Sequence, residues 1–142
     1  MRCRSSYIRS ILERFNVSRT SPIPAFPSVI LRAVKEKNIE GVPFREVVGS
    51  LMWIADQTRP DIANAVQAVA RYSYEPREVH WEVARKILAY LRATAHLGIT
   101  YHAKSDVVVN VEVYVDADYA SEDTARRSIS DAAVMCCNSP VA

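Results

Sequence analysis

The hydrophobic period of this chain changes once, near Gly98, and this change constrains the fold more than any other feature of the sequence. Before Gly98, apolar residues recur every three to four positions, as they do along one face of a helix. After it, residues 107–115 carry valine at every second position, as along one face of a strand. The sequence therefore predicts an α+β fold, with helices first and a sheet after them.

Four segments before Gly98 carry the helical period. The predicted helices cover residues 6–17, residues 44–55, a stretch after Pro60 that ends before Pro76, and about residues 77–95. Between the first two, three prolines in residues 18–29 exclude a helix and indicate an extended linker. Gly49 costs the second helix about 1 kcal/mol relative to alanine. We expect a packing reason for this glycine, for example the close approach of another helix.

The third predicted helix begins at a recognisable start signal, Thr58-Arg59-Pro60-Asp61. Thr58 can cap the helix, and Asp61 three residues later would complete a capping box. Pro60 is tolerated in the first turn. The apolar residues expected to face inward from this helix are Ile62, Ala65, Val66, Val69 and Ala70.

The strand region is short for an independent sheet. Residues 99–102 and 107–116 are strand candidates, 119–128 read as a polar connection, and 129–137 can return as a partner strand. Two or three strands leave open edges and little surface to pack on. We therefore expect a partial antiparallel sheet of marginal stability.

Charge is unevenly spread along the 142 residues, although the net charge is only +2. Residues 1–104 hold sixteen Lys and Arg against nine Asp and Glu, whereas residues 105–142 hold two against seven. The basic part can face a polyanion, and the acidic part can hold a cation or form a solvated surface. No apolar run is long enough to span a membrane, and the first residues lack a signal-peptide pattern, so we expect an intracellular protein.

The sharpest local pattern for chemistry is VDAD at residues 115–118. Asp116 and Asp118 lie two apart on a predicted strand, and paired carboxylates suit Mg²⁺ or Mn²⁺. A solvated turn explains the same pattern without a metal. The three histidines lack zinc spacing, and His80, at a helix start, is expected to be a surface or capping residue. The three cysteines are expected to be reduced structural thiols.

Three blocks of sequence carry a family resemblance. They are PFREVVGSLMWIADQTRPDIANAVQAVAR at 43–71, HWEVARKILAYLRATAHLGITY at 80–101 and VYVDADYASEDTARRSIS at 113–130. In this order and at these distances, they resemble the Pol polyprotein of copia-type LTR retrotransposons, a class of transposable element. The similarity runs from the end of the reverse transcriptase into the start of the ribonuclease H domain.

The resemblance implies a division into three parts. Residues 1–40 would be the C-terminal edge of the reverse transcriptase region with a Pro-rich linker. Residues 41–98 would be a helical thumb-like or connection-like region that guides the primer–template duplex, and residues 99–142 a truncated ribonuclease H-like beginning. Asp116 would match the first metal-binding carboxylate of ribonuclease H, with Mg²⁺ or Mn²⁺ as the parent cofactor, whereas Asp118 would not be catalytic.

The resemblance also implies what the chain lacks. The polymerase palm and the later ribonuclease H carboxylates would lie outside it, and Asp131 stands where the family has glycine. We expect a polyprotein fragment that catalyses neither RNA-directed DNA synthesis nor RNA removal, because both need clustered carboxylates holding two cations. Weak binding to an RNA–DNA hybrid or another nucleic acid would remain. The alternatives are a freestanding helical protein-interaction module with no nucleic-acid role, and a nuclease that another chain completes.

Overall fold

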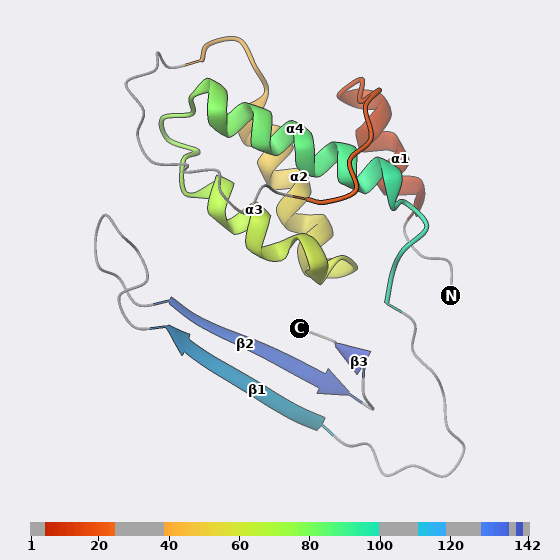
Figure 1. Ribbon diagram of the computed structural model, residues 1–142, viewed down its shortest axis with the longest axis vertical. Coiled ribbons are helices and arrows are strands. Elements are labelled where there is room, and N and C mark those ends of the chain that lie inside the picture. Colours follow the sequence, from red (N-terminus) through yellow and green to blue (C-terminus); the bar gives the residue numbers. More distant parts are fainter. Residues whose placement is uncertain (1–4, 25–38, 100–110, 119–128, 137–138, 141–142) are drawn as a thin grey trace. The chain divides into compact units, whose positions relative to one another are not determined.

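The computed structural model of the chain describes residues 5–24, 39–99, 111–118, 129–136 and 139–140. Two compact units make up the chain, Met1–Gly98 and Ile99–Ala142. The described part of the first unit is helical, and that of the second consists of strands (Figure 1). The predicted α+β class is confirmed at this level.

Each predicted helix is present, with ends that differ by a few residues. The helices are α1 (Ser5–Arg14), α2 (Phe44–Gln57), the short 3-10 helix η1 (Pro60–Ile62), α3 (Ala63–Ala70) and α4 (Glu78–Ala93). Helix α1 ends earlier than predicted because Asn16 has a left-handed backbone conformation, with φ of 49°. Asparagine adopts this conformation more readily than most residues, because its short side chain can hydrogen-bond locally.

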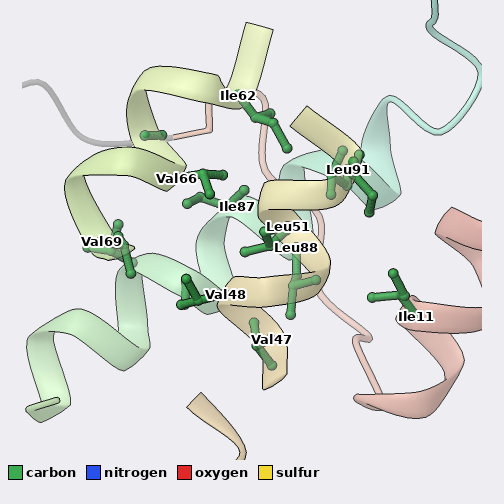
Figure 2. Close-up of a cluster of buried hydrophobic side chains, with 14 of the residues drawn as sticks. Ile11, Val47, Val48, Leu51, Ile62, Val66, Val69, Ile87, Leu88 and Leu91 are labelled. Carbon is green, nitrogen blue, oxygen red and sulfur yellow. The ribbon is translucent and has the colours of Figure 1, made fainter. Parts of the chain in front are cut away.

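The hydrophobic core of the first unit lies between α2, α3 and α4, with α1 packed against α4. Figure 2 shows aliphatic side chains from all four helices and η1 in one cluster. The buried members include Ile11, Val47, Val48, Leu51, Ile62, Val66, Val69, Ile87, Leu88 and Leu91. The predicted inward set of the third helix is confirmed except for Ala70, which is half-buried. Burial of this apolar area is the main favourable contribution to folding of the unit.

The expected reason for Gly49 is wrong. Gly49 is exposed, and a Cβ atom built on it would meet no other atom within 4 Å. Within the part of the chain that the structure describes, no helix therefore approaches the glycine closely, and packing there does not offset its cost to α2.

The expected capping box is also wrong, because the carboxylate of Asp61 is engaged elsewhere. Neither η1 nor α3 has a side-chain hydrogen bond at its N-cap. Instead, Arg59 Nε donates to Asp61 Oδ1 at 2.9 Å and Arg59 Nη2 to Asp61 Oδ2 at 2.7 Å. The phenol of Tyr90 on α4 donates to the same Oδ2 at 2.9 Å. Asp61 thus links η1 to α4.

Arg59 is the largest fully buried side chain of the described residues, with 1% of its surface exposed. Its Nη1 donates to the Thr94 carbonyl at 2.9 Å, and its Nη2 donates to Thr94 Oγ1 at 2.7 Å. Thr94 is the C-cap of α4, so the guanidinium satisfies one of the carbonyls that a helix end leaves unpaired. A single side chain therefore joins the start of η1 to the end of α4.

The contacts between Arg59 and Asp61 keep both side chains in their charged forms. Burial alone would lower the pKa of Arg59, but the hydrogen bonds and charge of Asp61 outweigh it, and the net pKa is raised. Burial alone would raise the pKa of Asp61, but the bonds from Arg59 and Tyr90 lower it below the ordinary 3.8. Both groups are therefore charged at neutral pH.

The second unit contains a small antiparallel sheet in the order β1-β2-β3. The strands are β1 (Val111–Asp118), β2 (Ile129–Cys136) and β3 (Ser139–Pro140). The predicted return of residues 129–137 as a partner strand is confirmed, with Val113 opposite Val134. The predicted strand at 99–102 and the connection at 119–128 lie outside the described residues. The ribonuclease H-like assignment of this sheet stays a prediction.

The division of the chain into a reverse transcriptase edge, a connection-like region and a ribonuclease H-like beginning also stays a prediction. Within the first unit, Ile8, Ile11 and Leu12 of α1 belong to the same core as the apolar residues of α2 to α4. Residues on both sides of the Pro-rich segment thus share one hydrophobic core.

Replacing Gly49 by alanine is expected to stabilise the chain. The substitution removes the conformational cost of glycine in a helix and meets no neighbour, so the free energy of unfolding should rise by about 1 kcal/mol. Urea unfolding followed by circular dichroism measures the change. Gly41→Ala is the matched control with the opposite sign, because Gly41 has φ of +79°. A loss of stability in Gly49→Ala would contradict the open surroundings of this position.

Replacing Asp61 by asparagine is expected to destabilise the chain by about 1–3 kcal/mol at neutral pH, because Arg59 would lose its charged partner. The pKa of Asp61 is lowered by folding, so its contribution is complete above its ordinary pKa of 3.8. That contribution disappears as the pH falls below 3.8 through the lower pKa of the folded state.

Urea unfolding of both proteins over a series of acidic pH values tests this pH dependence. The difference between wild type and Asp61→Asn should shrink below pH 3.8. The exposed Asp56→Asn on α2 serves as control. A difference that stays constant to strongly acidic pH would show that the carboxylate charge is not what stabilises the junction.

Candidate functional site

Asp116, the residue predicted to hold a metal, lies exposed on β1. The strand register places Asp131 of β2 directly opposite it, and places Asp118 opposite Ile129. On the same strand, the phenol of Tyr114 donates to Glu112 Oε2 at 2.8 Å, which raises the pKa of Tyr114. The sequence reasoning did not identify Asp131 as a partner of Asp116, because the register fixes that pairing.

The described residues do not supply the ligand set that two-cation chemistry needs. A pair of divalent cations is held by several converging carboxylates. Among the described positions, no three His, Cys, Asp or Glu side chains lie close enough to hold a metal ion. Glu122 and Asp123 lie outside the described residues. The side chains of Asp118 and Asp131 also lie outside what the structure describes, so the binding of Mg²⁺ or Mn²⁺ beside Asp116 stays a prediction.

His80 is buried and caps a helix. The predicted capping role is confirmed, and the predicted surface position is wrong. Its side chain is 1% exposed, and its Nδ1 accepts a hydrogen bond from the backbone N–H of Arg77 at 3.0 Å. The imidazole also stacks on the ring of Tyr72, with centroids 4.0 Å apart. His80 therefore orders the start of α4 and is not placed to act on a ligand.

A pocket of about 380 Å³ lies in the first unit, between the segment after α1 and residues 79–89 of α4. Its apolar lining includes Phe15, Val17, Trp81, Val83 and Leu88. We name this cavity, formed by residues 15–21 and 79–89, the α4 pocket. Sequence reasoning missed it because its two walls are about sixty positions apart. The only local signal is Trp81, an aromatic residue of α4 with Arg85 and Lys86 following on the same helix.

Two hydrogen bonds hold the segment after α1 against α4. Arg92 Nη1 donates to the Val17 carbonyl at 2.7 Å. The backbone N–H of Ser21 donates to the Ala89 carbonyl at 3.2 Å. In Figure 1, the chain that follows α1 runs across α4, in agreement with these contacts. The pocket wall between Val17 and Ser21 is therefore attached to α4 at both ends.

Positive charge gathers on the elements that form the α4 pocket. In the described residues 5–24 and 77–99, there are seven Lys and Arg and three Asp and Glu, a net charge of +4. Residues 39–76 have three Arg and five Asp and Glu, a net charge of −2. At the pocket itself, Arg19, Arg85 and Lys86 accompany one carboxylate, and partial burial lowers the pKa of Lys86. We refer to α1, the segment after it, and α4 together as the basic side of the helical unit, because of their net charge.

No helix in the described part of the chain is both long and apolar enough to cross a membrane.

Comparison with known proteins identifies several relatives. The chain is 36% identical over 131 residues to a retrovirus-related Pol polyprotein from transposon TNT 1-94 of Nicotiana tabacum, covering 86% of this chain. It is 34% identical over 119 residues to the Pol polyprotein from transposon RE1 of Arabidopsis thaliana, covering 82% of this chain. It is also 32% identical over 92 residues, 65% of this chain, to Secreted RxLR effector protein 161 of Plasmopara viticola.

The chain spans only a small part of its Pol relatives, 10% of the Nicotiana protein and 8% of the Arabidopsis protein, and 63% of the Plasmopara protein. No protein-family model matches the chain. No solved structure matches it either. The resemblance seen in the three sequence blocks is nevertheless confirmed by relatives that align with most of the chain. By sequence, this chain belongs to the retrovirus-related Pol polyproteins of copia-type transposons, of which it represents a short segment.

Proposed function

We propose that this segment of a retrotransposon Pol polyprotein contacts nucleic acid through its helical unit and does not itself catalyse a reaction. The observation that carries the proposal is the net charge of +4 on α1, the segment after it, and α4, set against −2 on the remaining described part of the unit. Relatives named as Pol polyproteins, aligned over more than four-fifths of this chain, support the same assignment.

A basic side of this kind binds the phosphates of a nucleic acid and does not distinguish between base sequences. Lys and Arg side chains that neutralise phosphates release condensed counterions, and this release supplies most of the non-specific affinity. Arg85 and Arg19 are exposed, so both can reach a phosphate backbone without rearrangement of the core. An RNA–DNA hybrid is formed by the parent activity of reverse transcription and consumed by RNA removal, and it is the duplex that we propose as partner.

We further propose that Asp116 is the remaining first carboxylate of a ribonuclease H site that is incomplete in this segment. In the parent enzymes, Mg²⁺ or Mn²⁺ would supply the activated water and stabilise the leaving oxygen. Asp116 is exposed on this strand, where a cation held by one carboxylate alone stays mostly hydrated.

A second candidate function, a protein-interaction module without a nucleic-acid role, has one observation in its favour. The apolar residues of β1 are strongly exposed, with Val113 at 60% and Val115 at 72%. Among the described strands, β1 lies at one end of the sheet, where a strand from a partner can add. Binding of nucleic acid by the purified chain separates the two functions.

The chain is expected to bind an RNA–DNA hybrid in a strongly salt-dependent manner. If about three phosphates are neutralised, affinity should fall roughly forty-fold between about 50 mM and about 200 mM salt. Fluorescence anisotropy of a labelled hybrid measures this, with the acidic peptide of residues 105–142 as a control that should not bind. Binding that does not change with salt, or no binding at low salt, would refute the proposed function.

The purified chain is expected not to cleave the RNA strand of a hybrid in Mg²⁺ or Mn²⁺, because the carboxylate set is incomplete. Wild type and Asp116→Asn should give the same rate as the buffer alone in a gel-based cleavage assay. Metal-dependent cleavage that Asp116→Asn abolishes would overturn the proposal and show that the segment is an active nuclease. Cleavage seen only after a second Pol segment is added would indicate a site completed by another chain.

A further inference from the structure

The α4 pocket has the size and lining of a site for a flat ring. Its volume of about 380 Å³ lies in the range of pockets that hold small ligands. Phe15 and Trp81 supply aromatic surface, and aliphatic side chains complete the apolar lining. Such a lining favours an aromatic or aliphatic group over a fully hydrated one.

Trp81 is positioned in advance by the fold. Its side chain is half-buried and packs against the hydrophobic core on α4, while also lining the pocket. At Phe15, the guanidinium of Arg14 lies 5.7 Å from the ring centroid and forms an ion pair with Glu46. Both aromatic side chains are therefore held before a ligand arrives, so that little conformational entropy is lost on binding.

One wall of the pocket is polar. Asn16, Ser18 and Thr20 line it and are exposed, so they offer donors and acceptors to the edge of a ring. Ser21 is different, because its hydroxyl already donates to the Ile23 carbonyl at 2.7 Å. The wall therefore combines hydrogen-bonding groups with the aromatic surface facing the same cavity.

The charged groups of the pocket are three cations, Arg19, Arg85 and Lys86, and one carboxylate, Glu82. Glu82 lies 3.2 Å from Arg85 and partly neutralises it. The net charge of the lining is +2, which attracts a ligand with negative charge beside its apolar part.

We propose that the α4 pocket binds one unpaired base of single-stranded nucleic acid, stacked on Trp81, with neighbouring phosphates at Arg19, Arg85 and Lys86. Every base has an aromatic face, so such a site accepts any sequence. A base within a duplex is already paired and stacked and would have to be extruded first. The pocket therefore prefers single strands to the hybrid. This inference rests on the proposed function and adds to it: beside the hybrid contact of the basic side, the pocket makes a separate contact with a single-stranded stretch.

The first test uses the full chain, a short oligothymidylate and a matched pair of tryptophan variants. Trp81→Leu should weaken binding about ten-fold, as expected for the loss of one stacked base, and Trp53→Leu on α2 should leave affinity unchanged. In the Trp53→Leu protein, the fluorescence of Trp81 should be quenched on binding. Equal affinities for the two variants, or no quenching of Trp81, would overturn the proposal.

The second test removes charge and does not disturb the core. Arg19 and Arg71 are both exposed, and only Arg19 lines the pocket. Arg19→Gln should reduce the slope of log affinity against log salt by about 0.7, the value for one single-strand phosphate. Arg71→Gln should leave the slope unchanged. This pair keeps the proposal falsifiable if Trp81→Leu fails to fold.

The outcomes separate this inference from the proposed function. Salt-dependent binding that is equal for wild type, Trp81→Leu and Arg19→Gln would leave the basic side as a nucleic-acid surface and overturn the pocket. Absence of any binding would overturn both. Preference for the hybrid over the single strand, or occupation of the pocket by an apolar peptide or anionic vesicles with no competition from oligothymidylate, would also overturn the pocket.

Discussion

The helical unit depends on one buried guanidinium. Arg59 closes the junction between η1 and the end of α4, and its contacts to Asp61 and Thr94 run in two directions from one planar group. A buried charge of this size is very costly without partners. Among the described residues, no buried side-chain nitrogen or oxygen lacks a partner, so that cost is met by contacts. Arg59 thus fixes the end of α4 against η1.

The helices were predictable because their apolar spacing is a local property. Val47, Leu51 and Ile54 are buried where a helix of period 3.6 would bury them. The capping box at Thr58 to Asp61 was a local interpretation that failed, because the Asp61 carboxylate accepts hydrogen bonds from Arg59 and from Tyr90, 29 positions later. The expectation for Gly49 failed for a similar reason, since a sequence does not show how much space surrounds a residue.

The two candidate sites also differ in how much of each could be predicted from local sequence patterns. Asp116 was found from a motif and lies on the predicted strand, but its cross-strand neighbour Asp131 emerged only from the register. The α4 pocket joins two walls that the sequence keeps apart, and the Pro-rich character of residues 18–29 had suggested only a linker for one of them. Sequence patterns identify single elements well, whereas cavities and cross-strand pairs depend on how elements are brought together.

Binding and catalysis respond differently when a polyprotein is reduced to a segment. Affinity for a polyanion is a sum of roughly independent phosphate contacts, so each lysine or arginine that remains contributes. Two-cation chemistry is not such a sum, because the transition state requires both ions and hence the whole set of carboxylates. Under the proposed function, a segment with seven cations on its basic side keeps the additive property, whereas an incomplete set of carboxylates would lose the cooperative one. The proposed function, holding nucleic acid without reacting with it, rests on this physical difference.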